Sequence, residues 1–413
     1  MRFSPIHRIP FTLKMSTFVI MVGFTAISSQ SFAKNGDTQT VMELIQEKSE
    51  GLALVALKNN PELFTDYTDQ DGAWEKKSDR TWCSGFVPGI FWYLNALSDD
   101  NTWKKRAKHW TEGVRSRAYQ TDNDTGFQIF DSFGLGYTIG GENSSDYKSV
   151  LIDGADTLVE QRYNKQIGAF RSWKQGVSDP TILPFEVNID QLMNMELILW
   201  VGENANKPEY TQMAISHADK TWANNVRDNG STYHVVSYNL KGEVVDKRTH
   251  QGWKDDSTWS RGQAWAVYAY AMYYRYTGLD RMLARSEKSY QYFIEATKQQ
   301  TNDWVPYADF DAPINAKNPR DTSATAIVAS ALLELYQITK EEKYLNDAQA
   351  MLVSLSTAQF LALDPSYQSI LLKGSEKWGE PEVGSIFGDY FFIEALYRWQ
   401  QYSPTTLPDN FGL

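Results

Sequence analysis

The sequence has 413 residues, of which 42 % are hydrophobic and 14 % aromatic, enough apolar material for one large core or two ordinary ones. Its formal net charge is −11, and so acidic a surface argues against nucleic acid as a partner. The single cysteine, Cys83, excludes an internal disulfide, so the fold depends on its hydrophobic core.

The first 33 residues are typical of a secretory signal peptide. Basic residues precede an apolar run at 18–24, and the small-residue site Ser31-Phe32-Ala33 follows. We expect cleavage after Ala33 and export to the periplasm or medium. Removal of the three basic residues changes the net charge from −11 to −14. A membrane anchor is the alternative, but the run is short and polar residues follow it; no other stretch is apolar enough to span a membrane.

The mature chain, 34–413, alternates two kinds of helical segment. Six are almost wholly apolar and begin at a small or polar residue: 84–97, 126–139, 189–200, 262–276, 323–335 and 388–397. Amphipathic segments rich in Lys, Asp and Glu follow at 103–114, 147–160, 210–224, 282–297 and 344–355, with 41–57 as a leading partner. The pattern predicts helical hairpins with an inner and an outer ring. We therefore expect an all-α fold, a closed (α/α)6 barrel that forms one catalytic domain.

An open helical solenoid is the rival fold. Solenoids need polar caps at both ends, whereas the last segment here is as apolar as the inner ones. No linker divides the chain into domains, and the unequal spacing of the inner segments predicts long loops. One alternating segment, 233–238 before Gly242, predicts a β-hairpin on one rim.

Polar and aromatic residues recur where the inner helices begin. The starts contain Trp82-Cys83-Ser84-Gly85, Asn123-Asp124-Thr125-Gly126, Asn188-Ile189-Asp190, Trp259-Ser260-Arg261-Gly262, Asp321-Thr322-Ser323 and Gly388-Asp389-Tyr390. In a ring of hairpins the inner helices run in one direction, so their starts converge on one mouth, where helix N-termini supply partial positive charge. We predict that this mouth is the active site.

Two carboxylates, Asp124 and Asp190, begin neighbouring inner helices. In a close pair one ionised group opposes ionisation of the other, and the protonated member can act as a general acid. Asp190 lies between Ile189 and Leu192 and is expected to be the more desolvated, so we predict that it carries the proton. The alternative is that both residues only cap their helices.

The segment 250–265 concentrates aromatic and polar side chains in a loop and one helical turn. Trp259 and Trp265 offer faces for a sugar ring, and the fork of Arg261 suits a carboxylate, which together with Gln251 indicates an acidic sugar. Three alternatives stay open. Trp259 and Arg261 form a cation–π pair, Trp265 belongs to the core, or His234 on the rim hairpin has no role.

Metal and nucleotide chemistry find little support in the sequence. His7 lies in the signal peptide, and His109 and His217 fall in outer amphipathic helices, so no His/Cys cluster has metal-ligand spacing. The sequence has no phosphate loop, dinucleotide fingerprint or serine nucleophile elbow. We expect no metal or cofactor.

Several motifs resemble those of the unsaturated glucuronyl hydrolases, glycoside hydrolase family 88. They are Trp82-Cys83-Ser84-Gly85-Phe86-Val87-Pro88-Gly89, Asn123-Asp124-Thr125-Gly126-Phe127, Ile189-Asp190-Gln191-Leu192-Met193-Asn194, Tyr233-His234-Val235-Val236, His250-Gln251-Gly252 and Asp256 to Trp265, continued by Asp321 to Ala326 and Gly388-Asp389-Tyr390. The resemblance implies removal of the unsaturated uronic acid that polysaccharide lyases leave at the non-reducing end of an oligosaccharide.

The resemblance also implies roles for individual residues. Asp190 matches the acid that protonates C4 of the sugar and then activates water, and Asp124 matches the second carboxylate. Trp82, His234, Gln251, Trp259, Arg261 and Trp265 match the residues that line the sugar subsite. Asn123, also expected in the subsite, stands where His is expected. An amide can hydrogen-bond but cannot titrate, so either the proton transfers or the preferred ring substituents are expected to differ.

Three other functions fit parts of the pattern. They are an unsaturated rhamnogalacturonyl hydrolase, an inverting glycosidase of saturated sugars with its carboxylates roughly 6.5–9.5 Å apart, and a non-catalytic periplasmic sugar-binding protein, which would not need Asp190. The expected partner is an anionic unsaturated oligosaccharide, and neither its parent polysaccharide nor the oligomeric state follows from the sequence.

Overall fold

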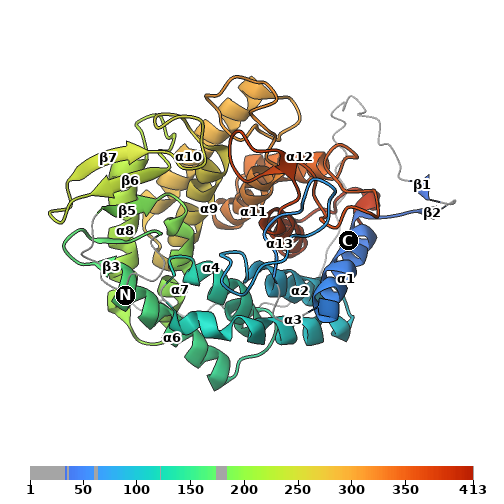
Figure 1. Ribbon diagram of the computed structural model, residues 1–413, viewed down its shortest axis with the longest axis horizontal. Helices are drawn as coiled ribbons and strands as arrows, with labels where there is room; N and C mark the ends of the chain where they lie inside the picture. Colours follow the sequence, from blue (N-terminus) through green and yellow to red (C-terminus); the bar gives the residue numbers. More distant parts are fainter. Residues whose placement is uncertain (1–32, 35–36, 60–63, 121, 174–183, 413) are drawn as a thin grey trace, which may run out of the picture. The chain divides into compact units, whose positions relative to one another are not determined.

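Six apolar helical segments surround a common axis in the described part of the chain, which comprises residues 33–34, 37–59, 64–120, 122–173 and 184–412 of a computed structural model. They are α2 (Phe86–Leu97), α4 (Thr125–Ile129) with the π-helix η2 (Phe130–Gly134) and α5 (Leu135–Thr138), α7 (Gln191–Asn204), α9 (Ser260–Thr277), α11 (Thr322–Thr339) and α13 (Ile386–Tyr402). Each packs against the next, and α13 returns to α2, so the ring is closed (Figure 1).

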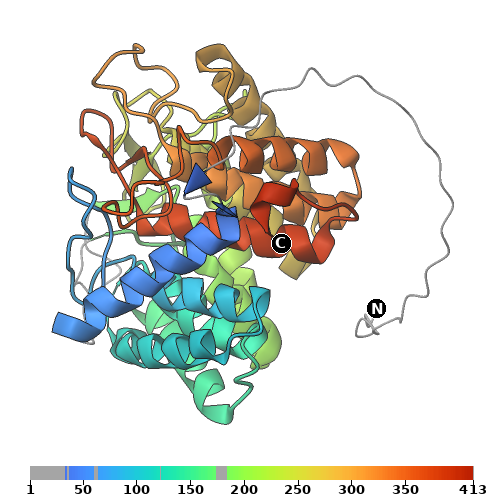
Figure 2. The ribbon, with the colours of Figure 1, turned by 90° about the vertical axis from the view of Figure 1, so that its right-hand side faces the viewer.

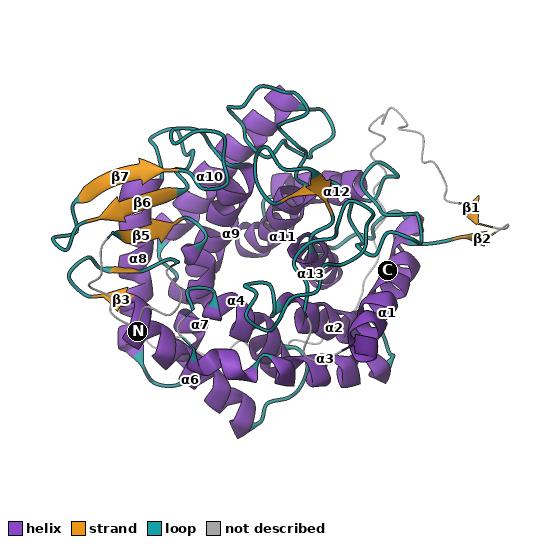
Figure 3. Ribbon diagram, in the orientation of Figure 1, coloured by secondary structure: helices purple, strands orange, loops and turns teal. Residues whose placement is uncertain are grey.

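An outer layer of amphipathic helices pairs with this ring (Figure 3). Its members are α1 (Val41–Asn59), α3 (Asn101–Gly113), α6 (Ser145–Arg162), α8 (Pro208–Asn225), α10 (Asp280–Gln300) and α12 (Glu342–Leu355). The outer helices α3, α6, α8, α10 and α12 each pack on the inner segment that precedes them. Helix α1 instead contacts α2 and the short helix η3 (Asp409–Phe411). Another short helix, η1 (Arg115–Tyr119), follows α3. The predicted (α/α)6 barrel is confirmed.

The hairpin α9–α10 illustrates why the two layers differ. Every residue of α9 from Ser260 to Tyr273 is buried, as expected for a helix that is apolar on all sides. In α10 the buried side chains recur at helical spacing, from Met282 through Ser286 and Tyr290 to Phe293, and the rest of the surface is polar. Gly278, at φ 63°, ends α9 in the left-handed conformation that glycine adopts without strain.

A three-stranded antiparallel sheet lies on one rim. The predicted hairpin is β6 (Val235–Tyr238) and β7 (Val244–Arg248), and β5 (Phe185–Asn188) adds an edge strand that was not predicted. Val236 pairs with Val187 on one side and Lys247 on the other. Because β5 runs directly into α7, the sheet fixes the chain at Asp190.

The remaining strands form two-stranded antiparallel pairs. They are β1 (Ala33–Lys34) with β2 (Asp37–Thr38), β3 (Tyr163–Asn164) with β4 (Ala169–Phe170), and β8 (Gly374–Ser375) with β9 (Glu382–Val383). The predicted signal peptide lies outside the described residues except for Ala33. None of the helices in the described part combines the length and hydropathy of a bilayer span.

Candidate active site

The starts of inner helices and the loops beside them enclose a cavity of about 280 Å³. Its walls are Asp66, Tyr67, Trp82, Asp124, Phe127, Trp173, Asn188, Asp190, His250, Gln251, Trp259, Arg261 and Glu376. The starts of α4, α7 and α9 therefore share one mouth, as predicted. Six predicted site residues line it: Trp82, Asp124, Asp190, Gln251, Trp259 and Arg261. Asn123, His234 and Trp265 are buried and do not.

Neither catalytic candidate is a helix cap. Asp124 and Asp190 directly precede α4 and α7, but neither side chain makes a capping hydrogen bond. At α7 the cap is Asn188, whose Oδ1 accepts the Gln191 N–H at 3.1 Å. Both carboxyl groups are thus directed to the cavity, which excludes the capping alternative.

Close packing of two helices places Asp124 beside Asn194. A Cβ atom on Gly126 would lie 2.3 Å from the Asn194 carbonyl oxygen, so only glycine allows this approach. The Asn194 amide then accepts the Phe127 N–H at 2.9 Å and donates Nδ2–H to Asp124 Oδ1 at 3.1 Å. The carboxyl of Asp124 is therefore held by a neutral donor.

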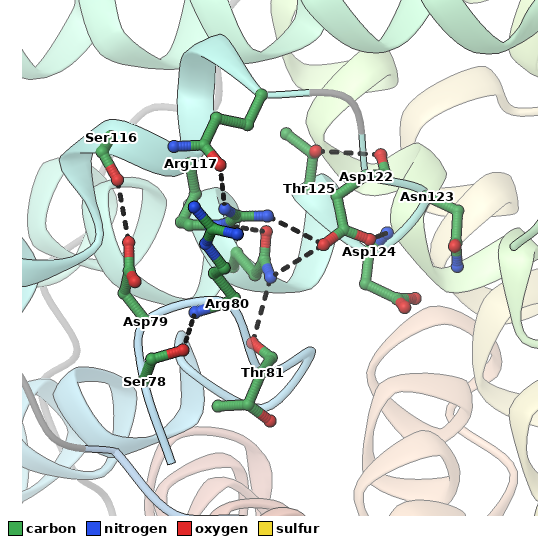
Figure 4. Close-up of polar contacts among 12 residues, drawn as sticks. Ser78, Asp79, Arg80, Thr81, Ser116, Arg117, Asp122, Asn123, Asp124 and Thr125 are labelled. Atoms are coloured by element: carbon green, nitrogen blue, oxygen red, sulfur yellow. Dashed lines mark hydrogen bonds and ion pairs between the residues drawn. The ribbon is translucent and has the colours of Figure 1, made fainter. Parts of the chain in front are cut away.

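A second acid, Asp122, lies directly behind Asp124. Its carboxylate forms an ion pair with Arg117 at 2.9 Å and accepts the backbone N–H of Asp124 at 3.1 Å (Figure 4). Burial, and then the negative charge of Asp122, raises the pKa of Asp124 to about 8, and the nearby Asp190 acts in the same direction. Asp124 is protonated at neutral pH.

This finding corrects the predicted position of the proton. The sequence suggested Asp190 because apolar residues flank it, but that argument left out Asp122, which adds a negative charge to the surroundings of Asp124. The two-residue spacing of Asp122 and Asp124 was the available signal, because both side chains belong to one tight turn.

His234 lies against Asp190 rather than in the cavity wall. The backbone N–H groups of His250 and Gln251 both donate to its Nδ1, each at 3.2 Å, so the proton of the neutral ring sits on Nε2. That Nε2 lies 3.5 Å from Asp190 Oδ2. With 3 % of its surface exposed, His234 is placed to orient Asp190 rather than to line a sugar subsite.

Asn123 is also buried, and its contacts are with the protein. Its Oδ1 accepts the Trp173 N–H at 2.9 Å, and its backbone carbonyl accepts Gln191 Nε2–H at 3.2 Å. Trp173 has a positive φ of 49°, uncommon for a bulky residue, and its ring lines the cavity. Asn123 therefore positions an aromatic wall, and the geometry gives it no direct place in the predicted subsite.

Arg261 is occupied by other protein groups. Its guanidinium forms a buried ion pair with Asp321 at 2.8 Å and donates to the backbone carbonyl groups of Ser375 and Glu376. It also lies 4.5 Å from the ring centroid of Trp259, so the cation–π alternative is confirmed. Its guanidinium group holds the loop after β8 in place. Fewer of its N–H donors are therefore left for a substrate carboxylate than predicted.

Trp82 and Trp265, both predicted to line the sugar subsite, have different surroundings. Trp82 lines the cavity and packs 5.0 Å from Phe387. Trp265 is 1 % exposed and lies between Phe127 and Phe391, at 5.5 and 5.3 Å. The core alternative therefore holds for Trp265, which supports Phe127 from behind.

Seven further residues of the wall were not predicted as site residues: Asp66, Tyr67, Phe127, Trp173, Asn188, His250 and Glu376. Asp66, Trp173, His250 and Glu376 come from loops that carry no periodic pattern, so of these four only His250, beside Gln251, had a sequence signal. Burial, followed by the charges of His234 and Arg248, lowers the pKa of His250. The cavity consequently holds four carboxyl groups and, among the described residues, a single guanidinium that is already paired.

Three buried polar atoms at this cavity have no hydrogen-bond partner among the described residues. They are Asp190 Oδ2, His234 Nε2 and Trp259 Nε1. The first two face each other at 3.5 Å, as described above, and all three atoms are shielded from solvent. The described residues contain no group of three or more His, Cys, Asp or Glu side chains arranged to hold a metal ion.

Comparisons with known proteins agree on one family. The family model described as Glycosyl Hydrolase Family 88 matches residues 55–403. An unsaturated glucuronyl hydrolase from Formosa agariphila is 37 % identical over 331 residues, which cover 79 % of this chain and 81 % of that protein. A crystal structure of an unsaturated glucuronyl hydrolase specific for heparin has a TM-score of 0.81 at 33 % identity, covering 89 % of this chain and 98 % of the other.

A mutant unsaturated glucuronyl hydrolase from Streptococcus agalactiae, complexed with dGlcA-GalNAc6S, is more distant. Its TM-score is 0.71 at 25 % identity, with 90 % of this chain and 95 % of that chain covered. The family match extends over every inner helix of the barrel and all the residues that line the cavity. The chain belongs to glycoside hydrolase family 88.

Proposed function

We propose that this glycoside hydrolase removes the 4,5-unsaturated uronic acid from the non-reducing end of lyase-generated oligosaccharides. The observation that carries the proposal is the pair of carboxyl groups, Asp124 and Asp190, in the cavity of a family 88 barrel. The relative from Formosa agariphila has the name of an enzyme with this activity.

The chemistry starts from the C4=C5 double bond, an enol ether whose oxygen is the ring oxygen. A carboxylic acid delivers a proton to C4, and positive charge develops at C5 and the ring oxygen. Water adds at C5 and gives up a proton, which forms a hemiketal. The C5 to ring-oxygen bond then opens to a ketone, and the hemiacetal left at C1 releases the remaining sugar. One water is consumed, and the acid is regenerated.

Asp190 is the proton donor in this proposal. Its side chain lines the cavity and is 15 % exposed, with Oδ2 facing His234, whereas Asp124 already accepts a hydrogen bond from Asn194. After it gives up the proton, the Asp190 carboxylate activates the water that adds at C5. Asp124 holds the shared proton of the pair in the free enzyme.

The negative charge of the substrate favours protonation of the carboxyl groups in the cavity. A uronate carboxylate that enters the cavity meets Asp66, Asp124 and Glu376 and no unpaired guanidinium among the described wall residues. An added negative charge favours the protonated form of neighbouring carboxyl groups. Binding of the anion therefore promotes the acid form on which the first step depends.

Neutral side chains also belong to this wall. Trp82, Gln251 and Trp259 line it, and Gln251 Nε2–H donates to the backbone carbonyl of Glu376 at 3.0 Å. The faces of Trp82 and Trp173 suit the apolar side of a sugar ring. The orientation of Asp190 comes from His234, whose Nε2–H is fixed toward it.

A panel of lyase-generated disaccharides tests the proposal. Loss of the ultraviolet absorbance of the conjugated C4=C5 acid reports turnover, and saturated disaccharides of the same linkage are the matched control. We expect turnover of the unsaturated compounds alone. Equal turnover of the saturated controls would instead identify an ordinary inverting glycosidase, and binding without turnover a sugar-binding protein.

We further propose that residues 1–33 direct export and are removed after Ala33. The support is the basic start, the apolar run at 18–24 and the small-residue site before Lys34. The N-terminal sequence of the protein recovered from a periplasmic fraction should begin at Lys34. An intact N-terminus in the cytoplasmic fraction would contradict this assignment.

A further inference from the structure

The turn at residues 249–253 determines which ring nitrogen of His234 carries the proton. Its backbone N–H groups at His250 and Gln251 both donate to His234 Nδ1, each at 3.2 Å. A ring nitrogen that accepts two N–H groups has no room for a proton of its own, so the proton is on Nε2, which faces Asp190. The position of this turn therefore affects the surroundings of the proton donor.

Regular secondary structure does not hold the turn. Residues 249–258 form neither helix nor strand, so their backbone groups depend on side chains for hydrogen bonds. Within the segment, Thr249 Oγ1 accepts the Gly252 N–H at 2.8 Å, and Asp255 Oδ1 accepts the Thr249 N–H at 3.0 Å. Both contacts are local, so they shape the turn without fixing its place against the barrel.

A buried carboxylate from another loop supplies that fixed point. Oδ2 of Asp309, which is fully buried, accepts the Trp253 N–H at 2.9 Å and the Ser257 O–H at 2.6 Å. Its Oδ1 accepts the N–H groups of Asp311 and Ala312, at 3.0 and 3.2 Å. Four donors on one carboxylate fix its orientation, and two of them belong to the segment that contains the turn.

Asp309 is itself anchored to the barrel. Its backbone N–H donates to Asn318 Oδ1 at 3.1 Å, and its carbonyl accepts Gln300 Nε2–H at 2.9 Å, from the end of α10. The preceding residue, Ala308, accepts the N–H of Ser260, the first residue of α9, at 2.9 Å. The carboxylate is therefore fixed relative to two helices, and the turn takes its position from it.

The contact between the turn and the carboxylate is close. A Cβ atom on Gly252 would lie 2.9 Å from Asp309 Oδ2 and 2.8 Å from Thr249 Oγ1, nearer than side-chain carbons ordinarily approach. Gly252 directly follows Gln251, whose N–H is one of the two donors to His234. A displacement of the carboxylate is consequently passed to that N–H over a single residue.

We propose that Asp309 is a positioning residue for the proton donor, because it holds the turn whose N–H groups keep the His234 proton on Nε2, facing Asp190. Asp309 lies outside the cavity wall and acts through this series of contacts. Its effect on turnover rests on the proposed function, whereas the state of the His234 ring is measured without substrate.

Nitrogen-15 NMR of the mature chain with labelled histidine tests the proposal in the Asp309→Asn variant. An amide keeps one acceptor oxygen and presents N–H groups to the remaining donors. At about pH 8, above the ordinary titration range of imidazole, the spectrum distinguishes protonated from unprotonated ring nitrogens, and His234→Asn identifies the signals. We expect Nε2–H alone in the wild type and a mixture of both tautomers in Asp309→Asn. A wild-type ring protonated at Nδ1, or unchanged His234 signals in a folded Asp309→Asn variant, would overturn the proposal.

Turnover in two backgrounds separates positioning from a merely structural role. Asp309→Asn should lower kcat roughly tenfold in the wild type, as for a small misplacement of a catalytic group. In His234→Asn, where the connection to Asp190 is already lost, it should lower kcat by about twofold or less. An equal loss in both backgrounds would refute the proposal. Asp389→Asn is the matched control: Asp389 is also buried and accepts the N–H groups of Ile370 and Leu371, and its loss should leave the His234 signals unchanged.

A second variant covers the case in which Asp309→Asn does not fold. Gly252→Ala pushes the turn away from Asp309 without a change of charge, at a residue outside the cavity wall. We expect mixed His234 tautomers and a lower kcat. A wild-type His234 spectrum in folded Gly252→Ala would contradict the proposal. Failure of the wild type to hydrolyse any unsaturated disaccharide would instead contradict the proposed function, and the nitrogen spectra would still decide whether Asp309 fixes the His234 ring.

Discussion

Both ends of the inner ring carry buried carboxyl groups, but the two catalytic candidates at the mouth lack the guanidinium partners that two glutamates have at the far end, away from the mouth. At the far end Glu334 and Glu394 are in contact with Arg398, and Arg275 adds a second guanidinium. At the mouth, Asp124 and Asp190 form no ion pair with a guanidinium group among the described residues. A carboxylate paired with a guanidinium group braces the helices that it joins, whereas burial without such a partner raises the pKa of Asp124, so that it keeps a proton.

Removal of the proposed proton donor should have the largest effect. Asp190→Asn keeps the size of the side chain but cannot deliver a proton, so we expect kcat to fall roughly 10²–10⁴-fold. Loss of ultraviolet absorbance on an unsaturated disaccharide measures it, with circular dichroism as the control for folding. Activity above a tenth of wild type would remove Asp190 from the mechanism.

The far end should respond in stability rather than in turnover. Glu334→Ala leaves Arg275 and Arg398 without their shared carboxylate, and we expect unfolding to become easier by about 3 kcal/mol, at the low end for buried pairs because Arg275 reaches solvent. Urea denaturation measures it. Glu341→Ala, which breaks an exposed pair with Lys343, is the matched control and should cost less than about 1 kcal/mol. Equal costs would contradict the contrast between the two ends.

His234 connects the mouth to the rim sheet, and its loss should lower turnover moderately. In His234→Asn the short amide can still accept the backbone N–H groups of His250 and Gln251, but it no longer reaches Asp190. We expect kcat to fall roughly 10-fold to 100-fold, as for loss of one oriented donor to a buried carboxyl, with little change in KM. A change confined to KM would assign His234 to sugar binding.

The raised pKa of Asp124 predicts a smaller, pH-dependent effect on stability. Because its pKa of about 8 exceeds that of an unfolded Asp, the native state binds more protons than the unfolded state between about pH 4 and 8, so wild-type stability declines as pH rises through this interval. Asp124→Asn lacks this decline. We expect its free energy of unfolding, relative to wild type, to increase by about 2 kcal/mol from pH 6 to 8. A difference that is constant with pH would contradict the shift.

The sequence predicted the barrel well because its signal is periodic. Inner segments such as 262–276 and outer ones such as 282–297 differ in how far around the helix the apolar residues extend, and this alone separates the two layers. The strand β5 escaped prediction because four residues give too short a pattern. Its pairing with β6 depends on contacts between positions 185–188 and 235–238, which no local rule reveals.

The candidate site was predictable in its members but less so in their roles. Motifs at helix starts brought Asp124, Asp190 and Trp259 to one cavity, because helix direction in the ring fixes which ends meet. The partners of each side chain depend on distant residues: Arg261 is held by Asp321, and Trp265 is covered by Phe391. A linear motif contains neither contact, so it assigns both residues to the substrate.

The junction of α1 with the end of the chain has a consequence for how the protein assembles. A Cβ atom on Gly412 would lie 2.7 Å from Thr40 Oγ1, so these two residues, far apart in the sequence, are close in space, and α1 runs beside the C-terminal segment in Figure 2. Contacts of such sequence separation form late in folding, and a chain synthesised from its N-terminus acquires α13 only after the other five inner segments. Phe387 of α13 packs against both Trp82 and Arg261. The catalytic mouth is therefore completed by the sixth inner helix, and a chain that stops before α13 is left with an open ring and no finished active site.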